Sequence, residues 1–223
     1  MNKLNGINRK RKKIGMVIGI LVASLITNNS FAQTIEVTPS YGFQFGSKLN
    51  YGPNYIKIDG SDQYGITIGF ETFDDIMAEV SYFHQGTELR IRDVIISPSE
   101  NRLADLSADW ILVGGTKYFP SGKIRPFVGG ALGMVIFNAK NENTSLINSS
   151  LDGTTKFSFA FKGGVNIMFS DRVGLNLQGN LMFPVEWGGV YVGGGTGGVG
   201  AGVGVSSTTL IGGFSGGLVF RIN

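Results

Sequence analysis

Few residues in this chain of 223 amino acids could carry out catalytic or metal chemistry. The sequence contains one histidine, His84, and no cysteine. Without cysteine the chain cannot be a disulfide-stapled module, a thiol-nucleophile enzyme or a protein with cysteine-ligated metal. With one histidine it cannot build a multi-histidine metal centre, and His84 alone would have to serve any Ser-His-Asp chemistry. We therefore expect no enzyme activity, no metal and no cofactor.

Two other features invite a chemical interpretation. Asp74 and Asp75 could mimic an acid/base or calcium pair, but an Asp pair between strands ordinarily forms a turn. The segment 188–204 reads GGVYVGGGTGGVGAGVG and echoes phosphate-binding loops. However, no Lys-[Ser/Thr] follows it, and it lacks a strand-helix-strand context. We expect a flexible surface loop there, or, as a sharper hypothesis, a mobile element that contacts a host, a phage or a partner protein.

The N-terminus has the layout of an export signal. Six of the 19 Lys and Arg residues and none of the 16 acidic residues lie in residues 1–32, so residues 33–223 carry a net charge of −3. An apolar stretch over 14–26 leads to Ser30 and Ala32, as in a cleaved signal peptide. This stretch is shorter than the ~18–20 residues of a spanning helix. We prefer a signal peptide over a membrane anchor or a nucleic-acid patch, and expect one domain over 33–223.

Beyond residue 33, hydrophobicity alternates with a period of two, which is typical of β-strands. Three segments show this cleanly, with one apolar phase and one small or polar phase: 157–169, 173–185 and 210–222. Five earlier segments show it less purely: 35–46, 64–71, 76–83, 106–118 and 125–137. In 106–118 we assign Trp110 and Leu112 to the apolar, outward phase. In 125–137 both phases carry apolar residues, so its faces stay unassigned.

The connections between these eight segments alternate between short and long. The short ones are polar turns at 74–75, 120–123 and 170–172, and the long ones run over about 47–62, 92–105, 138–155 and 187–207. Outer-membrane barrels have short periplasmic turns on one rim and long extracellular loops on the other. The sequence therefore predicts an all-β fold, an eight-stranded antiparallel transmembrane up-and-down β-barrel with both termini in the periplasm.

A soluble lipocalin-like ligand-binding barrel would also have alternating strands. Such a fold turns its apolar phase inward and needs a solvated exterior. Here the polar phase is mostly Gly, Ser, Asn and Gln, and only 16% of all residues are charged. Aromatic residues also gather toward segment ends, as interfacial belts require. We prefer the membrane barrel and keep the soluble barrel as an alternative.

Two motifs carry a resemblance to a known family. The segment 125–133 reads RPFVGGALG, and the closing segment 216–223 reads GGLVFRIN. Both are similar to strands of the small eight-stranded outer-membrane β-barrels of the outer-membrane protein A and X kind. The segment 82–86, YFHQG, resembles a strand end of the related barrel family named for the PorT secretion protein. The chain departs from the pattern by ending in Asn223 rather than Phe. The resemblance implies a scaffold and no particular activity.

An eight-stranded barrel has an interior that side chains just fill, so a wide pore is not expected. Inward candidates near the short-turn rim include two acids and two bases: Glu71, Glu79, Lys117 and Arg221. Charges in a low-dielectric interior must be paired. We therefore hypothesise that these four form an ion-pair cluster that plugs the lumen, with a proton or ion path as the less favoured alternative.

Lipid-deacylating outer-membrane barrels use a His-x-Ser arrangement, but His84 is followed by Gln85 and Gly86. We expect His84 to lie in an aromatic belt or at a rim, and Glu88 does not suffice for a hydrolase.

The most favoured function is a non-enzymatic structural or surface-interaction barrel. The alternative is a small channel, transport or secretion-accessory barrel. Expected partners are outer-membrane lipid and lipopolysaccharide, the barrel-insertion machinery and an unidentified surface ligand or secretion partner. We expect a monomer that does not bind nucleic acid.

Overall fold

The computed structural model describes residues 34–73, 75–95, 97–146, 153–195, 198–207 and 210–222, with backbone alone over 186–195 and 198–207. The expected signal peptide over 1–32, Asp74 and Asn223 lie outside the described residues. The strands are β1 Ile35–Gln44, β2 Ser47–Tyr51, β3 Asn54–Ile58, β4 Ser61–Phe73, β5 Ile76–Asp93, β6 Ser97–Tyr118, β7 Ile124–Lys140, β8 Thr154–Met168, β9 Val173–Gly195, β10 Gly198–Ser207 and β11 Ile211–Ile222. In this described part, no helix has the length and apolarity needed to cross a membrane.

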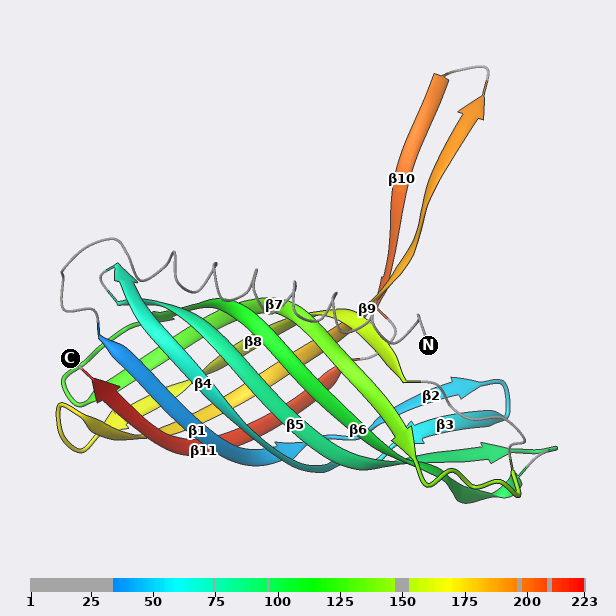
Figure 1. Ribbon diagram of the computed structural model, residues 1–223, viewed down its shortest axis with the longest axis horizontal. Helices are drawn as coiled ribbons and strands as arrows, with labels where there is room; N and C mark the ends of the chain where they lie inside the picture. The colour runs from blue at the N-terminus through cyan, green and yellow to red at the C-terminus, as the bar shows by residue number, and fades with distance from the viewer. Residues whose placement is uncertain are drawn as a thin grey trace, which may run out of the picture. The chain divides into compact units, whose positions relative to one another are not determined.

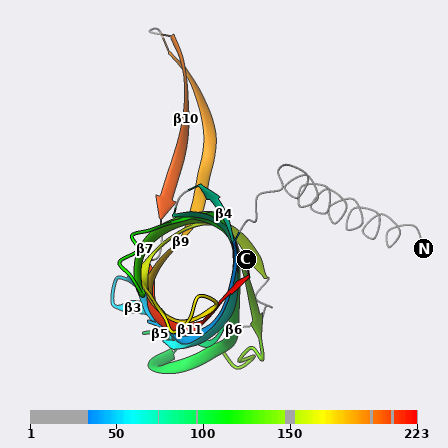
Figure 2. The ribbon, with the colours of Figure 1, turned by 90° about the vertical axis from the view of Figure 1, so that its left-hand side faces the viewer.

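Eight of these strands close into an antiparallel ring. The order around the ring is β1, β4, β5, β6, β7, β8, β9 and β11. Strand β11 then pairs with β1, from Ile35↔Ile222 to Gln44↔Gly213, and closes the ring. Figure 1 shows the strands inclined to the long axis, and Figure 2 shows the ring nearly end-on. The predicted eight-stranded antiparallel up-and-down β-barrel is confirmed.

One rim of the ring carries the short turns, and we call it the short-turn rim. The turns that join β4 to β5, β6 to β7 and β8 to β9 lie there, together with the start of β1 and the end of β11. Asp75 and Gly122 adopt φ values of 61° and 62° in the first two turns. Gly takes this left-handed conformation without steric cost, and Asp tolerates it better than most residues.

At the opposite rim, which we call the long-connection rim, strands continue past the ring. The β2–β3 hairpin pairs with β5 from Tyr55↔Arg92 to Ile58↔Leu89. Strands β5 and β6 stay paired as far as Asp93↔Ser97. Strand β9 also continues and pairs with β10. The expectation of long loops over 92–105 and 188–204 is therefore wrong, because paired strands take up most of both and satisfy backbone groups that a loop would leave to water.

The ring has an apolar outer face and a mixed inner face. The exposed outward positions on three strands illustrate the former: Ile66 and Ile68 on β4, Val128 and Leu132 on β7, Leu177 and Leu181 on β9. Inward positions such as Ser158, Asn166 and Asn176 are buried. This arrangement matches the face assignment of the three clean segments.

The face assignment of 106–118 is wrong. Trp110 is 0% exposed and Leu112 is also buried, so both point into the lumen, while Ile111 and Val113 are exposed. Both phases of this strand are apolar, so the outward preference of large apolar residues could not identify its faces. On β7, Arg125 and Val135 lie inward and Leu132 lies outward, which resolves the segment left unassigned.

Inward glycines bring neighbouring strands close together. A Cβ on Gly42 would overlap the carbonyl oxygen of Phe214 on β11, and a Cβ on Gly114 would overlap that of Gly130 on β7. These positions therefore accept only glycine without a shift of backbone. Glycine at these inward positions thus allows neighbouring strands of a small, tightly curved ring to approach each other closely.

Candidate functional site

A buried carboxylate organises the lumen near the short-turn rim. Glu36 points inward from β1, and its Oε1 lies 2.6 Å from Nη1 of Arg125 on β7. The same oxygen lies 3.0 Å from Nε of Arg221 on β11. The hydroxyl of Tyr118 on β6 donates a hydrogen bond to the other oxygen, Oε2, at 3.1 Å. Four strands from around the ring thus meet at Glu36.

A chain of hydrogen bonds extends this cluster across the lumen. The amide of Asn176 donates to Oδ1 of Asn166 at 2.7 Å, and the amide of Asn166 donates to the Tyr118 hydroxyl at 3.3 Å. The Arg125 guanidinium lies over the Tyr118 ring, 4.3 Å from its centroid. We call Glu36, Tyr118, Arg125, Asn166, Asn176 and Arg221 the lumen cluster. Its charges have partners, as burial requires.

A second ion pair lies nearby. Glu79 on β5 pairs with Nζ of Lys162 on β8. The same ammonium lies 5.7 Å from the centroid of the Phe127 ring. The Glu79 side chain is buried and that of Lys162 is mostly buried. This pair again joins strands that are not neighbours in the ring, so it spans the lumen.

The structure separates the four residues of the hypothesised ion-pair cluster. Arg221 pairs with Glu36, and Glu79 pairs with Lys162. Lys117 lies on the outward phase of β6 and approaches Asp75 at 3.9 Å. Glu71 makes no ion pair with any residue that the structure describes. The four therefore do not form one cluster. Glu79 and Arg221 pair with other residues, and Lys117 faces outward because the two phases of β6 are the reverse of those expected.

Sequence reasoning missed three charged residues that form these ion pairs, Glu36, Arg125 and Lys162. It also missed the three polar residues of the lumen cluster, Tyr118, Asn166 and Asn176. Glu36 and Lys162 do fall on the inward phases of their segments, and that signal could have found them. Arg125 could not be found this way, because the faces of its strand were ambiguous.

Above these ion pairs, toward the long-connection rim, apolar side chains fill the lumen. The buried cluster comprises Phe83, Ala108, Trp110, Leu112, Val135, Ala160, Met182 and Ile211. Between this cluster and the Glu79–Lys162 pair lies a cavity of about 30 Å³. A cavity of this volume holds about one water molecule. The described lumen is therefore packed rather than open.

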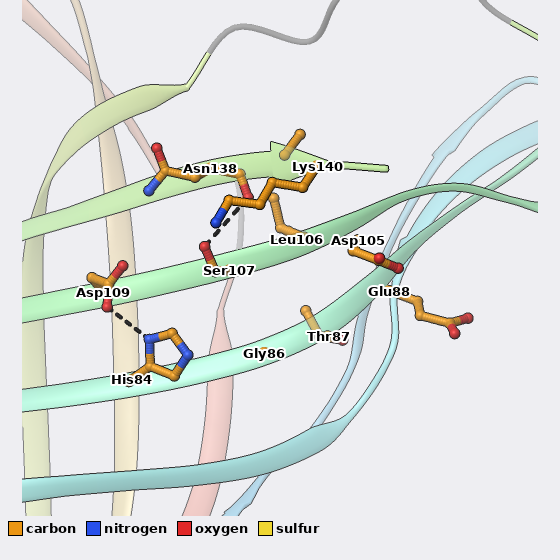
Figure 3. Close-up of a pocket in the computed structure, with 11 residues that line it drawn as sticks. His84, Gly86, Thr87, Glu88, Asp105, Leu106, Ser107, Asp109, Asn138 and Lys140 are labelled. Atoms are coloured by element: carbon orange, nitrogen blue, oxygen red, sulfur yellow. Dashed lines mark hydrogen bonds and ion pairs between the residues drawn. The ribbon is translucent and has the colours of Figure 1, made fainter. Parts of the chain in front are cut away.

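A much larger cavity lies on the outside of the barrel. It has a volume of about 860 Å³ and opens over the outward faces of β5, β6 and β7 toward the long-connection rim. We call it the wall groove. Its polar lining comes from His84 and Glu88 on β5, Asp105, Ser107 and Asp109 on β6, and Asn138 and Lys140 on β7. Figure 3 shows these side chains on neighbouring strands.

The lone histidine is held at the lower end of this groove. Nδ1 of His84 lies 2.7 Å from Oδ1 of Asp109, which is its direct cross-strand neighbour. The Tyr82 hydroxyl donates to the same oxygen at 2.7 Å. The Tyr64 ring packs against His84 with centroids 5.0 Å apart. Because a carboxylate only accepts hydrogen bonds, Nδ1 of His84 is the donor in this contact.

Ser107 also lies in the groove, two residues from Asp109 on β6 and opposite Gly86. Its hydroxyl donates to the backbone carbonyl of Asn138 at 3.4 Å, and no hydrogen bond joins it to His84 in the described part of the chain. A serine nucleophile needs its base within hydrogen-bond reach. Among the described residues, no group of three or more His, Cys, Asp or Glu could hold a metal ion. The polar side chains that line the groove offer hydrogen-bond donors and acceptors.

We compared the sequence and the structure with those of known proteins. No protein-family model matches the sequence, and no curated protein matches it. Solved structures do match. The outer membrane protein OprG from Pseudomonas aeruginosa is 14% identical, with a TM-score of 0.60 over 86% of this chain and 97% of OprG. Neisserial surface protein A is 13% identical, with a TM-score of 0.54 over 87% of this chain and 100% of that protein. The protein therefore has the fold of the small eight-stranded outer-membrane β-barrels.

Proposed function

We propose that this protein is an integral outer-membrane β-barrel with a closed lumen and a non-enzymatic role, either structural or in surface interaction. In this proposal residues 1–32 direct export and are removed. The short-turn rim and both termini face the periplasm, because outer-membrane barrels have their short turns on that side. The β2–β3 and β9–β10 hairpins and the β5–β6 extension then face the exterior of the cell.

The observation that carries the proposal is the apolar outer face of a closed ring. Its exposed aliphatic and aromatic side chains come from every ring strand, including Tyr41, Ile68, Val80, Val113, Leu132, Phe161, Leu181 and Leu218. Monomeric soluble proteins rarely expose a contiguous apolar surface of more than a few hundred Å². Lipid is the solvent that suits such a wall, and closure leaves no unpaired strand edge within it.

The packed lumen supports a structural or surface role over a channel. Trp110 and Leu112 lie above the Glu36 and Glu79 ion pairs, so an ion would have to displace both a polar and an apolar layer. The hydroxyl of Ser107, engaged with a backbone carbonyl, supports the non-enzymatic assignment. The alternative of a channel or secretion-accessory barrel predicts ion conductance that changes when Glu79 or Lys162 is altered.

The proposed partners follow from this placement. The outer wall would contact outer-membrane lipid and lipopolysaccharide, and the barrel-insertion machinery would assemble the protein. A surface ligand or secretion partner would bind at the long-connection rim, since binding residues concentrate on exposed connections of a rigid scaffold. We propose a monomer, because ring closure leaves no barrel strand unpaired.

Gel migration of the outer-membrane fraction, with and without boiling, tests this proposal. We expect the protein in that fraction, with a band that shifts on boiling and an N-terminal sequence that starts at Gln33. Planar bilayers containing the refolded protein should show no steady conductance. A soluble protein without a heat shift would contradict the proposal and favour the soluble ligand-binding barrel, and steady conductance would favour the channel.

A further inference from the structure

We infer that the wall groove binds the sugar-phosphate headgroup of an outer-leaflet glycolipid, with the acyl chains of the lipid lying along the apolar wall below. This inference rests on the proposed function, because it needs the barrel to stand in an outer membrane. It adds a binding site on the outer wall, away from the lumen and the hairpin tips.

The first argument is the height of the groove on the wall. His84 lies eight residues beyond Ile76, the first residue of β5 at the short-turn rim. At a rise of about 3.3 Å per residue and a tilt of roughly 40°, this places His84 about 20 Å above that rim. The apolar band of such barrels is about 25 Å tall. By the same arithmetic Glu88, twelve residues beyond Ile76, lies about 30 Å above that rim. The groove therefore straddles the upper edge of the apolar band and extends into the headgroup region.

The second argument is that the groove continues into apolar wall. The register places Ile111 beside Tyr82 and opposite Met134, one outward position below Asp109. Ile111 and Met134 are both exposed, and so is Val113 further down. A molecule whose polar head fills the groove would therefore have its tail against aliphatic side chains. That combination fits an amphipathic lipid better than a small soluble solute.

The third argument is the chemistry of the lining. Lys140 supplies a cation, and Asn138 and Ser107 supply neutral hydrogen-bonding groups, which suits a phosphate flanked by hydroxyls. The carboxylates can accept hydrogen bonds from sugar hydroxyls or from an amine. Groups of both kinds line one hollow of about 860 Å³, which is within the range of small-ligand sites.

The three carboxylates of the groove already have partners, which argues against a bare cation site. Asp109 accepts hydrogen bonds from His84 and Tyr82, and Glu88 pairs with Arg90 at 2.7 Å. Asp105 pairs with Arg102 and also accepts a hydrogen bond from Asn141 at 2.7 Å. These contacts fix the acceptors in place before a ligand arrives, so little ordering cost remains on binding.

Two variants test separately whether binding needs the positive charge of the groove and whether it needs the open space of the groove. Lys140→Ala removes the cation. Gly86→Leu fills the floor, and it should fold without strain because a Cβ on Gly86 meets no atom within 4 Å. Lys123→Ala is the matched control, since Lys123 is an exposed lysine at the short-turn rim. All three proteins should keep the heat-shifted band, which shows that the barrel is intact.

Native mass spectrometry of the refolded mature barrel in detergent, with added bis-phosphorylated lipid A, measures binding. We expect a one-to-one complex for the wild type and for Lys123→Ala, and at least a roughly tenfold weaker one for Lys140→Ala and Gly86→Leu. Equal binding by all four proteins would overturn the inference. Phosphatidylglycerol that competes as well as lipid A, or glucosamine 6-phosphate that displaces it fully, would overturn the assignment to a glycolipid. A lost heat shift in the wild type would instead refute the proposed function.

Discussion

At the scale of single residues, Glu36 connects the charged residues of the lumen cluster. One carboxylate compensates two guanidinium groups and accepts the Tyr118 hydroxyl, and the Glu36 side chain is only 4% exposed. The desolvation of these charges is offset only while the partners remain together, since a buried ion left alone costs several kcal/mol. The stability of the barrel should therefore depend on Glu36 far more than on Glu71, which has no ion-pair partner among the described residues.

Glu36→Gln should lower the free energy of unfolding by about 3–5 kcal/mol, because it leaves the buried Arg125 without its counter-charge. Urea unfolding of the refolded barrel, followed by tryptophan fluorescence, measures this. Glu71→Gln is the control and should change the free energy by less than about 0.5 kcal/mol. Equal effects of the two substitutions would contradict the description of the lumen cluster.

At the scale of elements, the period-two pattern was sufficient to find all eight ring strands. It also assigned the faces of β8, β9 and β11, where one phase is small or polar. It failed on β6, because Trp110 and Ile111 are both large and apolar, and the lumen itself needs large apolar side chains. It also missed that β5 and β6 extend well past the ring. Past the ring, β5 pairs with β3 as well as with β6, and no local pattern of residues 92–105 reveals β3 as a partner.

The β2–β3 hairpin is attached to β5 by charged side chains at the long-connection rim. Asp59 pairs with Nζ of Lys57 at 2.6 Å and with Nε of Arg90 at 2.6 Å, which ties the end of β3 to β5. Burial by itself would raise the pKa of Asp59, but the hydrogen bonds and positive charges of Lys57 and Arg90 hold it below its ordinary value of 3.8. The charged form of Asp59 is therefore the one that stabilises the attachment.

The attachment should weaken in acid. Because the folded pKa is depressed, the contribution of Asp59 is fully present above pH 3.8 and is lost as the pH falls through the folded pKa. Methyl NMR signals of Ile56 and Ile58, in the barrel reconstituted in nanodiscs, should report this loss below pH 3.8. Asp59→Asn should show the weakened attachment at pH 6 already. Unchanged signals in this variant would mean that backbone pairing alone holds the hairpin.

At the scale of the whole molecule, the alternation of short and long connections predicted the closed ring. What the sequence could not supply is which inward residues meet across the lumen. Glu36 and Arg125 are 89 positions apart, and Glu79 and Lys162 are 83 apart. These contacts depend on the relative heights of strands on opposite walls, which follow from the accumulated register of the whole ring. The wall groove is likewise assembled from three strands and has no sequence motif.

The central claim is that the outward face of the ring contacts lipid, and spin labels can test it directly because the chain has no cysteine. Val113→Cys and Leu132→Cys place a label on the outward phase, and Thr38→Cys places one on the inward phase. In lipid vesicles, labels at 113 and 132 should be accessible to oxygen and protected from a water-soluble nickel reagent. The label at 38 should be accessible to neither. Ready access of the nickel reagent to 113 and 132 would contradict the membrane-spanning barrel.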